Sequence, residues 1–261
     1  AWTHGWYGRE SRTKVILKKI FYSLHHKIFL YGEYALQLMK EQGFAPEKLF
    51  CIANSLDSDA EKAIRETLVE TPIYKEHFHN DWPTVIYCGR IQKGKKLEML
   101  VNSLKLMNDD GFSANAVIVG KDVDGVGLHQ LVSQQGLDSQ VWFYGPCYDN
   151  KTLAQLFYNA AVCVSPGHVG LTAIHSLTFG CPVITHNNFP YNAPEFEAIT
   201  PGLTGDFFEQ DNIVDLKAKM QRWLSLSPEE RAQVRSHAFA EVDRKWNIHH
   251  QINIIKKAIY E

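Results

Sequence analysis

Short apolar runs alternate with amphipathic segments through the middle of the chain. The runs cover residues 85–88, 116–119, 141–144, 162–164 and 182–185. The first four each end at a glycine or a Ser-Pro-Gly turn, and a segment with apolar residues at helical spacing follows each of them. Short buried strands that alternate with helices are typical of a parallel sheet covered by helices on both faces. The pattern therefore predicts an α/β fold with a Rossmann-like, doubly wound parallel sheet.

The first part of the chain, to about residue 57, repeats this alternation on a smaller scale. Apolar residues on one face predict a helix over 11–24, and strands are predicted at 27–30 and 49–52. A further helix lies between these strands and ends at Gly43. This pattern predicts a partial second Rossmann-like domain, which the polar residues 58–82 connect to the larger sheet.

Helices predominate in the last third of the chain. Asp211 is the predicted N-cap of a helix that carries Leu216 and Trp223. The run Ser227-Pro228-Glu229-Glu230 has the pattern of a capping box, with proline at the first helical position. The final stretch, from about residue 246, has an apolar face at helical spacing. We therefore expect consecutive helices after the last strand.

Composition and charge exclude several classes of protein. Apolar residues make up 45% of the chain and charged residues 21%, as in ordinary globular proteins. A net charge of −2 gives no bias toward nucleic acid, and we expect no nucleic-acid partner. No apolar run approaches the roughly 18 residues needed to cross a bilayer, and no signal peptide is recognisable, so we expect a cytoplasmic protein. Five widely spaced cysteines predict reduced thiols, and the start at Ala1 without methionine suggests a piece of a longer chain.

The segment from Gly89 to Lys96 is the strongest local feature. It reads Gly89-Arg90-Ile91-Gln92-Lys93-Gly94-Lys95-Lys96 and directly follows an apolar run. Arginine offers a forked set of donors, lysine a compact charge, and the start of the next helix free N–H groups. A loop of this kind can hold phosphate. A solvated basic turn explains the same residues, so the segment alone does not decide between the two interpretations.

A second glycine-containing loop, Ser165-Pro166-Gly167-His168-Val169-Gly170-Leu171-Thr172, also lies between a strand and a helix. Its glycines let the backbone approach a ligand closely, and the following helix presents its positive end. Because the carboxyl ends of parallel strands meet at one edge of the sheet, the two loops together could grip a diphosphate. Each loop taken singly is also explained by packing.

The order of the motifs resembles the C-terminal domain of family 4 glycosyltransferases, which have the GT-B fold of two facing Rossmann-like domains. The matching residues, in order, are Gly89-Arg90 with Lys95, Val119-Gly120, Phe143-Tyr144-Gly145, Tyr158-Asn159-Ala160, Ser165-Pro166, Gly170-Leu171, Gly180-Cys181-Pro182-Val183-Ile184, Pro194-Glu195 and Gly202-Leu203-Thr204-Gly205. Residues 1–75 then resemble the end of the N-terminal, acceptor-side domain with a linker. Residues 76–245 resemble the nucleotide-sugar-binding domain, and 246–261 resemble a helix that returns to the first domain.

The resemblance implies a retaining transfer of a sugar from a UDP- or GDP-sugar to a glycan or a lipid-linked glycan. It also implies that Arg90 and Lys95 hold the diphosphate and stabilise charge on the departing nucleotide without a metal or cofactor. Lys93-Gly94 is a rival match for the lysine, but the spacing from Lys95 to Leu100 fits the family better.

The resemblance also places the remaining donor contacts. The backbone of Tyr144 and Gly145 would meet the base, and the amides of Gly170, Leu171 and Thr172 would meet phosphate or sugar. The further donor-site positions that it implies are Gly89, Ser165, Gly167, His168 and His175. His4 occupies a place where the family often has a histidine beside the reaction centre. An ordinary loop histidine is the alternative for His4.

The sequence departs from the family at a pair of glutamates. Aligning on Gly170-Leu171 puts Gly167 where one glutamate contacts the donor sugar and His175 where the other contacts the ribose. His175 can form a ribose hydrogen bond, whereas Gly167 cannot act through a side chain. His168 is a candidate replacement, with a surface histidine as the alternative. A nucleotide-sugar-binding pseudoenzyme and a GT-B phosphorylase or hydrolase therefore stay open, while no G-x-G-x-x-G motif supports a nicotinamide enzyme.

Two further features have a plain and a functional interpretation. Asp122-Val123-Asp124 resembles a metal-binding Asp-x-Asp motif but lacks its strand context, and the histidine pairs lack a third ligand, so we expect no metal. The region of the first helix carries Arg9, Arg12, Lys14, Lys18 and Lys19. Such a basic face could rest on anionic lipid as a peripheral membrane contact, and a solvated helix face explains the same residues.

Overall fold

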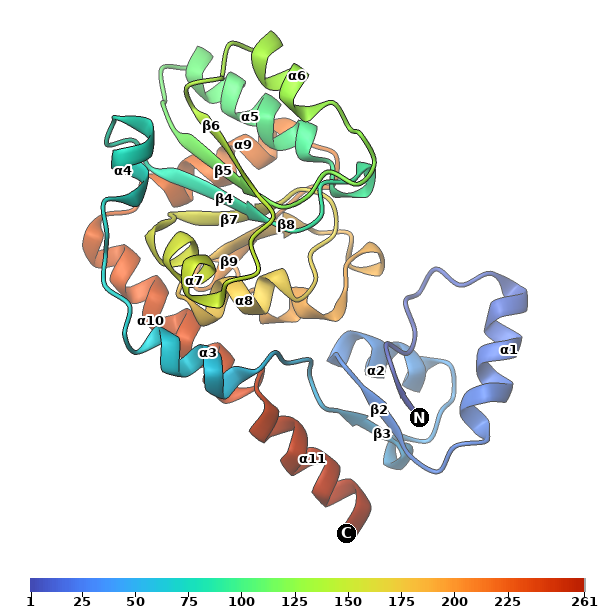
Figure 1. Ribbon diagram of the computed structural model, residues 1–261. Coiled ribbons are helices and arrows are strands. Elements are labelled where there is room, and N and C mark those ends of the chain that lie inside the picture. Colours follow the sequence, from blue (N-terminus) through green and yellow to red (C-terminus); the bar gives the residue numbers. More distant parts are fainter. Residues whose placement is uncertain (261) are drawn as a thin grey trace.

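The computed structural model describes residues 1–260, which form a small and a large parallel sheet (Figure 1). The small sheet has the order β1-β2-β3, with all strands parallel. Its elements are β1 (Trp2–Thr3), α1 (Arg12–Ser23), β2 (Ile28–Leu30), α2 (Glu33–Glu41), the 3-10 turn η1 (Pro46–Lys48) and β3 (Leu49–Cys51). The helix and strands predicted before residue 57 are therefore confirmed, to within a few residues at each end.

The large sheet has six parallel strands in the order β6-β5-β4-β7-β8-β9. They are β4 (Thr84–Cys88), β5 (Asn115–Val119), β6 (Val141–Gly145), β7 (Val162–Ser165), β8 (Val183–His186) and β9 (Gly205–Phe208). The chain winds outward from β4 to β6, returns to pair β7 with the other side of β4, and winds outward again to β9. This is the doubly wound order that the alternation predicted, and its switch point lies between β4 and β7.

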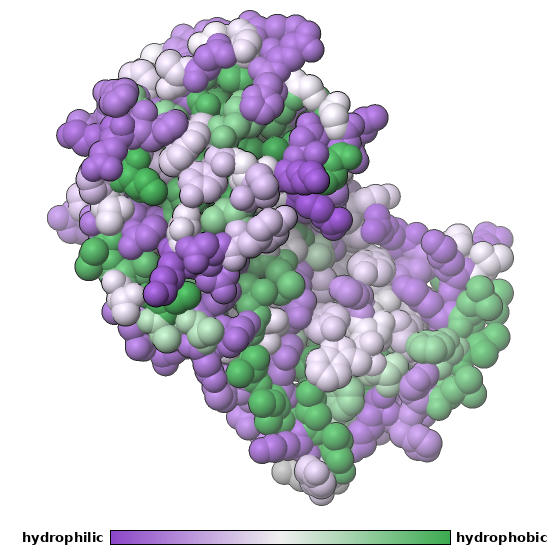
Figure 2. Space-filling view, in the orientation of Figure 1, coloured by the Kyte–Doolittle hydropathy of each residue, from purple (hydrophilic) through white to green (hydrophobic). Residues whose placement is uncertain are grey.

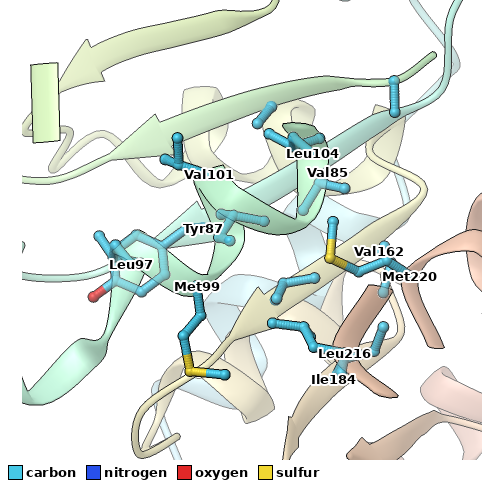
Figure 3. Close-up of a cluster of buried hydrophobic side chains, with 14 of the residues drawn as sticks. Val85, Tyr87, Leu97, Met99, Val101, Leu104, Val162, Ile184, Leu216 and Met220 are labelled. Carbon is cyan, nitrogen blue, oxygen red and sulfur yellow. The ribbon is translucent and has the colours of Figure 1, made fainter. Parts of the chain in front are cut away.

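Helices cover both faces of the large sheet, as predicted. One face carries α5 (Leu97–Asp109), α6 (Leu128–Gln134) and α9 (Ile213–Leu224), and the other carries α7 (Asn150–Asn159), α8 (Thr172–Thr178) and α10 (Pro228–Arg244). Side chains alternate between the two cores along each strand. Val85 and Tyr87 therefore lie in the core with α5 and α9 (Figure 3). Ile86, between them, lies in the core with α7 and α8. Burial on both faces explains why these strands are continuously apolar.

The sequence analysis missed two strands, β1 with only two residues and β9, and misplaced one cap. β9 was not predicted because only Phe207 and Phe208 are apolar in it. Asn212, not Asp211, caps α9, since its side-chain oxygen accepts from the N–H groups of Val214 and Asp215. The residue Asp211 adopts a left-handed conformation with φ of 63° and pairs with Lys96 instead. The capping box at Ser227 is confirmed.

Three helices join the two parts of the molecule. The connection contains α3 (Ser58–Arg65) and α4 (Ile73–Phe78), and α11 (Ile248–Tyr260) runs back past the small sheet (Figure 1). From α11, Gln251 Nε2 donates to the Ala53 carbonyl at 2.5 Å. The 3-10 turns η3 (Phe189–Tyr191) and η4 (Pro194–Ala198) lie between β8 and β9, and η2 (Lys93–Lys95) precedes α5. Within residues 1–260, no helix is both long enough and apolar enough to span a bilayer.

Candidate functional site

A cleft of about 500 Å³ separates the small part from the carboxyl edge of the large sheet. The residues lining it are His4, Tyr7 and Arg9 from the small part and Gly94, Lys96, Gly167, His168, His186, Tyr191, Asn192, Ala193 and Gln210 from the large part. The loops that follow β4, β7 and β8 therefore meet here. Open α/β sheets bind ligands at this edge, beside the switch point. A second hollow, around Tyr158 and Arg235, lies at the opposite, amino edge of the sheet, so its position favours the cleft as the ligand site.

The two loops that the sequence singled out pack directly against each other. Gly167 N donates to the Lys95 carbonyl at 2.9 Å, and Lys95 Nζ donates to the His168 carbonyl at 2.7 Å. A Cβ atom added to Gly167 would lie 2.6 Å from Lys95 Cα and closer still to the Gly94 carbonyl oxygen. Because these neighbours are backbone atoms, no side chain fits at position 167. The neighbouring loop thus occupies the space that the side chain of a glutamate at position 167 would need.

Lys95 is largely buried in this contact. Burial, followed by the nearby positive charge of Arg90, lowers the pKa of Lys95 to about 8. Arg90 itself is exposed at the end of β4, where its carbonyl accepts a hydrogen bond from Tyr87 Oη at 2.7 Å. Thr172 Oγ1 donates to the Cys88 carbonyl at 3.0 Å and so fixes the start of α8 beside β4. The structure therefore brings Arg90, Lys95 and Thr172 together at the switch point.

Other predicted donor-site residues lie around this centre. Gly89 follows β4 with φ of +149°, a conformation that favours glycine. Tyr144 and Gly145 end β6, two strands from β4, so their contact with a base stays a prediction. Ser165 is buried beneath its loop, and its Oγ donates to the His168 carbonyl at 3.3 Å. This hydrogen bond shapes the loop, and a contact of Ser165 with the donor stays a prediction.

His4 and His168 line the cleft, whereas His175 does not. The His175 ring packs beside Phe157 and Phe179, and its Nε2 lies 3.4 Å from Glu61 Oε1 of α3. Burial lowers the pKa of His175 to about 4 and raises the pKa of Glu61 to about 7, so His175 is neutral at pH 7. The predicted ribose contact of His175 stays a prediction, and the contact that the structure gives it is with α3.

Several cleft residues escaped the sequence-based prediction. The sequence pattern groups Arg9 with the basic helix, but Arg9 precedes α1, and its guanidinium carbon lies 4.5 Å from the centre of the Tyr191 ring. Asn192 is buried, accepts from Val169 N at 3.0 Å and donates to the His186 carbonyl at 2.9 Å. Burial lowers the pKa of His186 to about 4. The strand before His186 was recognisable, but no pattern showed which side chains after it turn into the cleft.

Two carboxylates of η4 attach the small part to the large one. Glu197 accepts from the N–H groups of Glu33 and Tyr34 at 2.8 Å each, and it thereby caps α2 across the interface. Glu195 is buried and accepts from Asn54 Nδ2 at 2.5 Å. Burial raises the pKa of both carboxyl groups. Asn54, from the loop after β3, and the motif residue Glu195 thus meet between the small and the large part, a contact that the sequence alone did not suggest.

The electrostatic character of the cleft follows from its lining. Its side chains include Arg9, Lys96 and three histidines, and none of the described lining residues is an aspartate or a glutamate. The Asp122 carboxylate, considered above as a metal ligand, accepts from the N–H groups of three following residues and so forms a turn. A cleft with this lining suits an anionic ligand.

Comparison with solved structures reveals the same architecture in several proteins. Anabaena HepE, solved in complex with UDP, is 16% identical with a TM-score of 0.76 over 98% of this chain and 70% of its own. A glycosyltransferase from Rickettsia africae is 18% identical with a TM-score of 0.75 over 100% of this chain and 70% of its own. Sucrose-phosphate synthase from Thermosynechococcus elongatus is 18% identical with a TM-score of 0.72 over 98% of this chain and 63% of its own. At such identities the likeness establishes the GT-B type of fold.

A comparison with curated protein sequences gave no match. The family described as glycosyl transferases group 1 matches residues 70–240, which include β4 to β9 and both loops at the switch point. This match covers well over half of the chain. The chain therefore belongs to the group 1 glycosyl transferases.

Proposed function

We propose that this protein transfers a sugar, with retention, from a UDP- or GDP-sugar to a glycan or a lipid-linked glycan, as a family 4 enzyme of hexosyltransferase type. The observation that carries the proposal is the pair of hydrogen-bonded loops at the switch point, with Arg90 and Lys95 beside a cleft that has no aspartate or glutamate among its described lining residues. UDP complexes of HepE support a nucleotide-diphosphate donor. Residues 1–75 would serve the acceptor side, 76–245 the donor, and 246–261 the return to the first part.

In this mechanism Arg90 and Lys95 stabilise the negative charge that develops on the departing nucleotide diphosphate. Two cationic side chains can supply this stabilisation without a metal ion or cofactor. The donor phosphate helps to remove the proton of the acceptor hydroxyl on the face from which the nucleotide departs, which retains the configuration. His4 lines the cleft on the side of the small part, which supports a contact with the transferred sugar in this mechanism.

Calorimetric titration with UDP, GDP and ADP, without and with Mg²⁺, tests the proposal. We expect one nucleotide to bind with an affinity that Mg²⁺ does not change. Arg90→Ala and Lys95→Ala should each weaken binding about tenfold or more, because a charge-assisted hydrogen bond contributes about 1.5–3 kcal/mol. Lys93→Ala, in the same loop, is the control and also tests the rival lysine. Unchanged affinity in both the Arg90 and Lys95 variants would refute the diphosphate site.

The packing of Gly167 favours a second candidate function, a nucleotide-sugar-binding pseudoenzyme. The position has no room for the glutamate that would contact the donor sugar. Single-turnover assays with the bound donor and a pool of glycan acceptors separate the two functions. Transfer or slow hydrolysis of the donor supports the enzyme, including the phosphorylase or hydrolase variants of it, whereas tight binding without turnover supports the pseudoenzyme.

We also propose that α1 rests on an anionic lipid surface at the cytoplasmic face of a membrane. Five apolar side chains of this region are between 53% and 75% exposed and form a stripe (green at the right of Figure 2). They are Ile16, Leu17, Ile20, Phe21 and Leu24. On a helical projection Lys14 flanks one side of the stripe, and Arg12 and Lys19 flank the other, as in interfacial helices. Sedimentation with phosphatidylglycerol vesicles should retain the wild-type chain and release Phe21→Glu, and equal behaviour of the two would contradict this contact.

A further inference from the structure

Arg9 places an uncompensated positive charge in the cleft. Its guanidinium carbon lies 4.5 Å from the ring centre of Tyr191 and 5.5 Å from that of Tyr7, one ring from each part of the molecule. Within residues 1–260, the guanidinium forms no hydrogen bond and no ion pair, so its five N–H donors are available. The two tyrosine rings hold the planar group through cation–π contacts. The two rings therefore orient the Arg9 guanidinium, and its N–H groups stay available to a ligand.

The other basic groups of the site are already engaged. Lys96 forms an ion pair with Asp211, and Lys95 donates to the His168 carbonyl. Burial lowers the pKa of His168 and His186, so both imidazoles are neutral at pH 7 and each offers one N–H donor. Arg90 and Lys95, which the proposed function assigns to the diphosphate, do not line this cleft. The charge of Arg9 is thus additional to the diphosphate site.

The described lining of the cleft also offers no carboxylate acceptor for the hydroxyl groups of a neutral sugar. Sugar hydroxyl groups donate well to carboxylates, but the backbone of the Gly94–Lys95 loop fills the space beside Gly167. None of the described lining residues supplies a carboxylate in its place. Donor groups therefore exceed anionic acceptors on the walls. A ligand that itself brings the carboxylate complements such a surface better than a neutral hexose does.

We propose that the cleft takes a carboxylate-bearing sugar, of the uronic acid type, whose carboxylate accepts a forked pair of hydrogen bonds from Arg9. The planar guanidinium matches a carboxylate in this geometry. The inference deepens the proposed glycosyl transfer and rests on it, since it assigns the substrate class of the same site. The carboxylate comes either from the sugar of the nucleotide donor or from a sugar of the acceptor, because the cleft lies between the two parts of the molecule.

The donor arm of the test compares sugars that differ only at C6. UDP-glucose and UDP-glucuronate, or GDP-mannose and GDP-mannuronate if GDP is the preferred nucleotide, are titrated into the wild-type chain. We expect the uronate to bind about tenfold tighter, the effect of one charge-assisted contact at a partly exposed site. Arg9→Gln should abolish this preference, and Arg9→Lys should retain less than half of it, because lysine keeps the charge but loses the fork.

Arg12→Gln is the matched control. It removes one positive charge from the exposed first turn of α1, outside the cleft, and so reports the effect of the net charge of the protein without the contact in the cleft. A preference that falls equally in Arg9→Gln and Arg12→Gln would overturn the proposal. Titration with UDP and GDP alone reports on the proposed function, because it involves no sugar.

The acceptor arm needs no nucleotide. Methyl glucuronide and methyl glucoside are each titrated and followed by NMR chemical shifts, with wild type, Arg9→Gln and Arg12→Gln. Shifts with the glucuronide that depend on Arg9, without a donor preference, assign the carboxylate to the acceptor. Equal affinity for uronate and neutral sugar in both arms would overturn the proposal, even if UDP or GDP binds and the glycosyltransferase function stands.

Discussion

Gly167 offers the sharpest test of how the two loops form the site. Gly167→Ala adds one methyl group at a position where a Cβ would lie 2.6 Å from Lys95 Cα. Real side chains do not pack at this distance, and the neighbour is backbone, which cannot rotate away. The loop must therefore move, and the hydrogen bond from Gly167 N to the Lys95 carbonyl is strained or lost.

The magnitude follows from these contacts. Overpacking by one methyl group costs about 1–3 kcal/mol, and a lost backbone hydrogen bond adds about 0.5–1.5 kcal/mol. We expect Gly167→Ala to lower the free energy of unfolding by about 2–4 kcal/mol, or the affinity for the nucleotide by a comparable amount if the loop moves without unfolding. Gly167→Glu, which restores the residue usual in the family, should be worse in both respects.

Urea unfolding and calorimetric titration of the preferred nucleotide measure the two effects. Gly94→Ala is the matched control, since a Cβ on Gly94 meets no atom within 4 Å. Both variants make the same change within one pair of loops. If Gly167→Ala were as stable as Gly94→Ala and bound nucleotide as well, the tight packing of position 167 would be refuted. A Gly167→Glu variant with improved turnover would refute it more directly.

Three further predictions concern charge and capping. Burial lowers the pKa of Lys95 to about 8, and a bound diphosphate raises this pKa again. Binding of the nucleotide should therefore take up protons near pH 8 and weaken as the pH rises above 8. Calorimetry in buffers of different ionisation enthalpy measures the proton uptake, and the absence of uptake would contradict the contact between Lys95 and the diphosphate. Glu197→Gln should weaken the attachment of α2 to the large part by about 1 kcal/mol. Hydrogen exchange measures this effect: exchange should become faster in residues 33–41, while β4 to β6 keep their protection. Asn212→Ala should lower the free energy of unfolding of the protein by about 1 kcal/mol. Asp211→Ala should lower it by less, because Asp211 does not cap α9. The reverse order of the two variants in urea unfolding would contradict the assignment of the cap to Asn212.

The sequence by itself determined the architecture of the large sheet. Strands buried on both faces must be apolar throughout, and helices that cover them must be amphipathic, so β4 to β8 could be located from periodicity alone. The same reasoning located the two loops at the switch point, because the carboxyl ends of parallel strands share one edge. Short elements with few apolar residues, such as β9, carry too little of this signal.

Tertiary structure alone decided how the site is completed. Arg9 and Gly167 are far apart in the sequence, yet both line the cleft, and nothing in the spacing indicated that Arg9 turns toward Tyr191 rather than joining the helix face. The absence of a side chain at position 167 was visible in the sequence, but its cause, the Lys95 backbone packed against it, was not. Periodicity records which face of an element is buried, whereas the side chains that meet in a cleft are fixed by packing between elements remote along the chain.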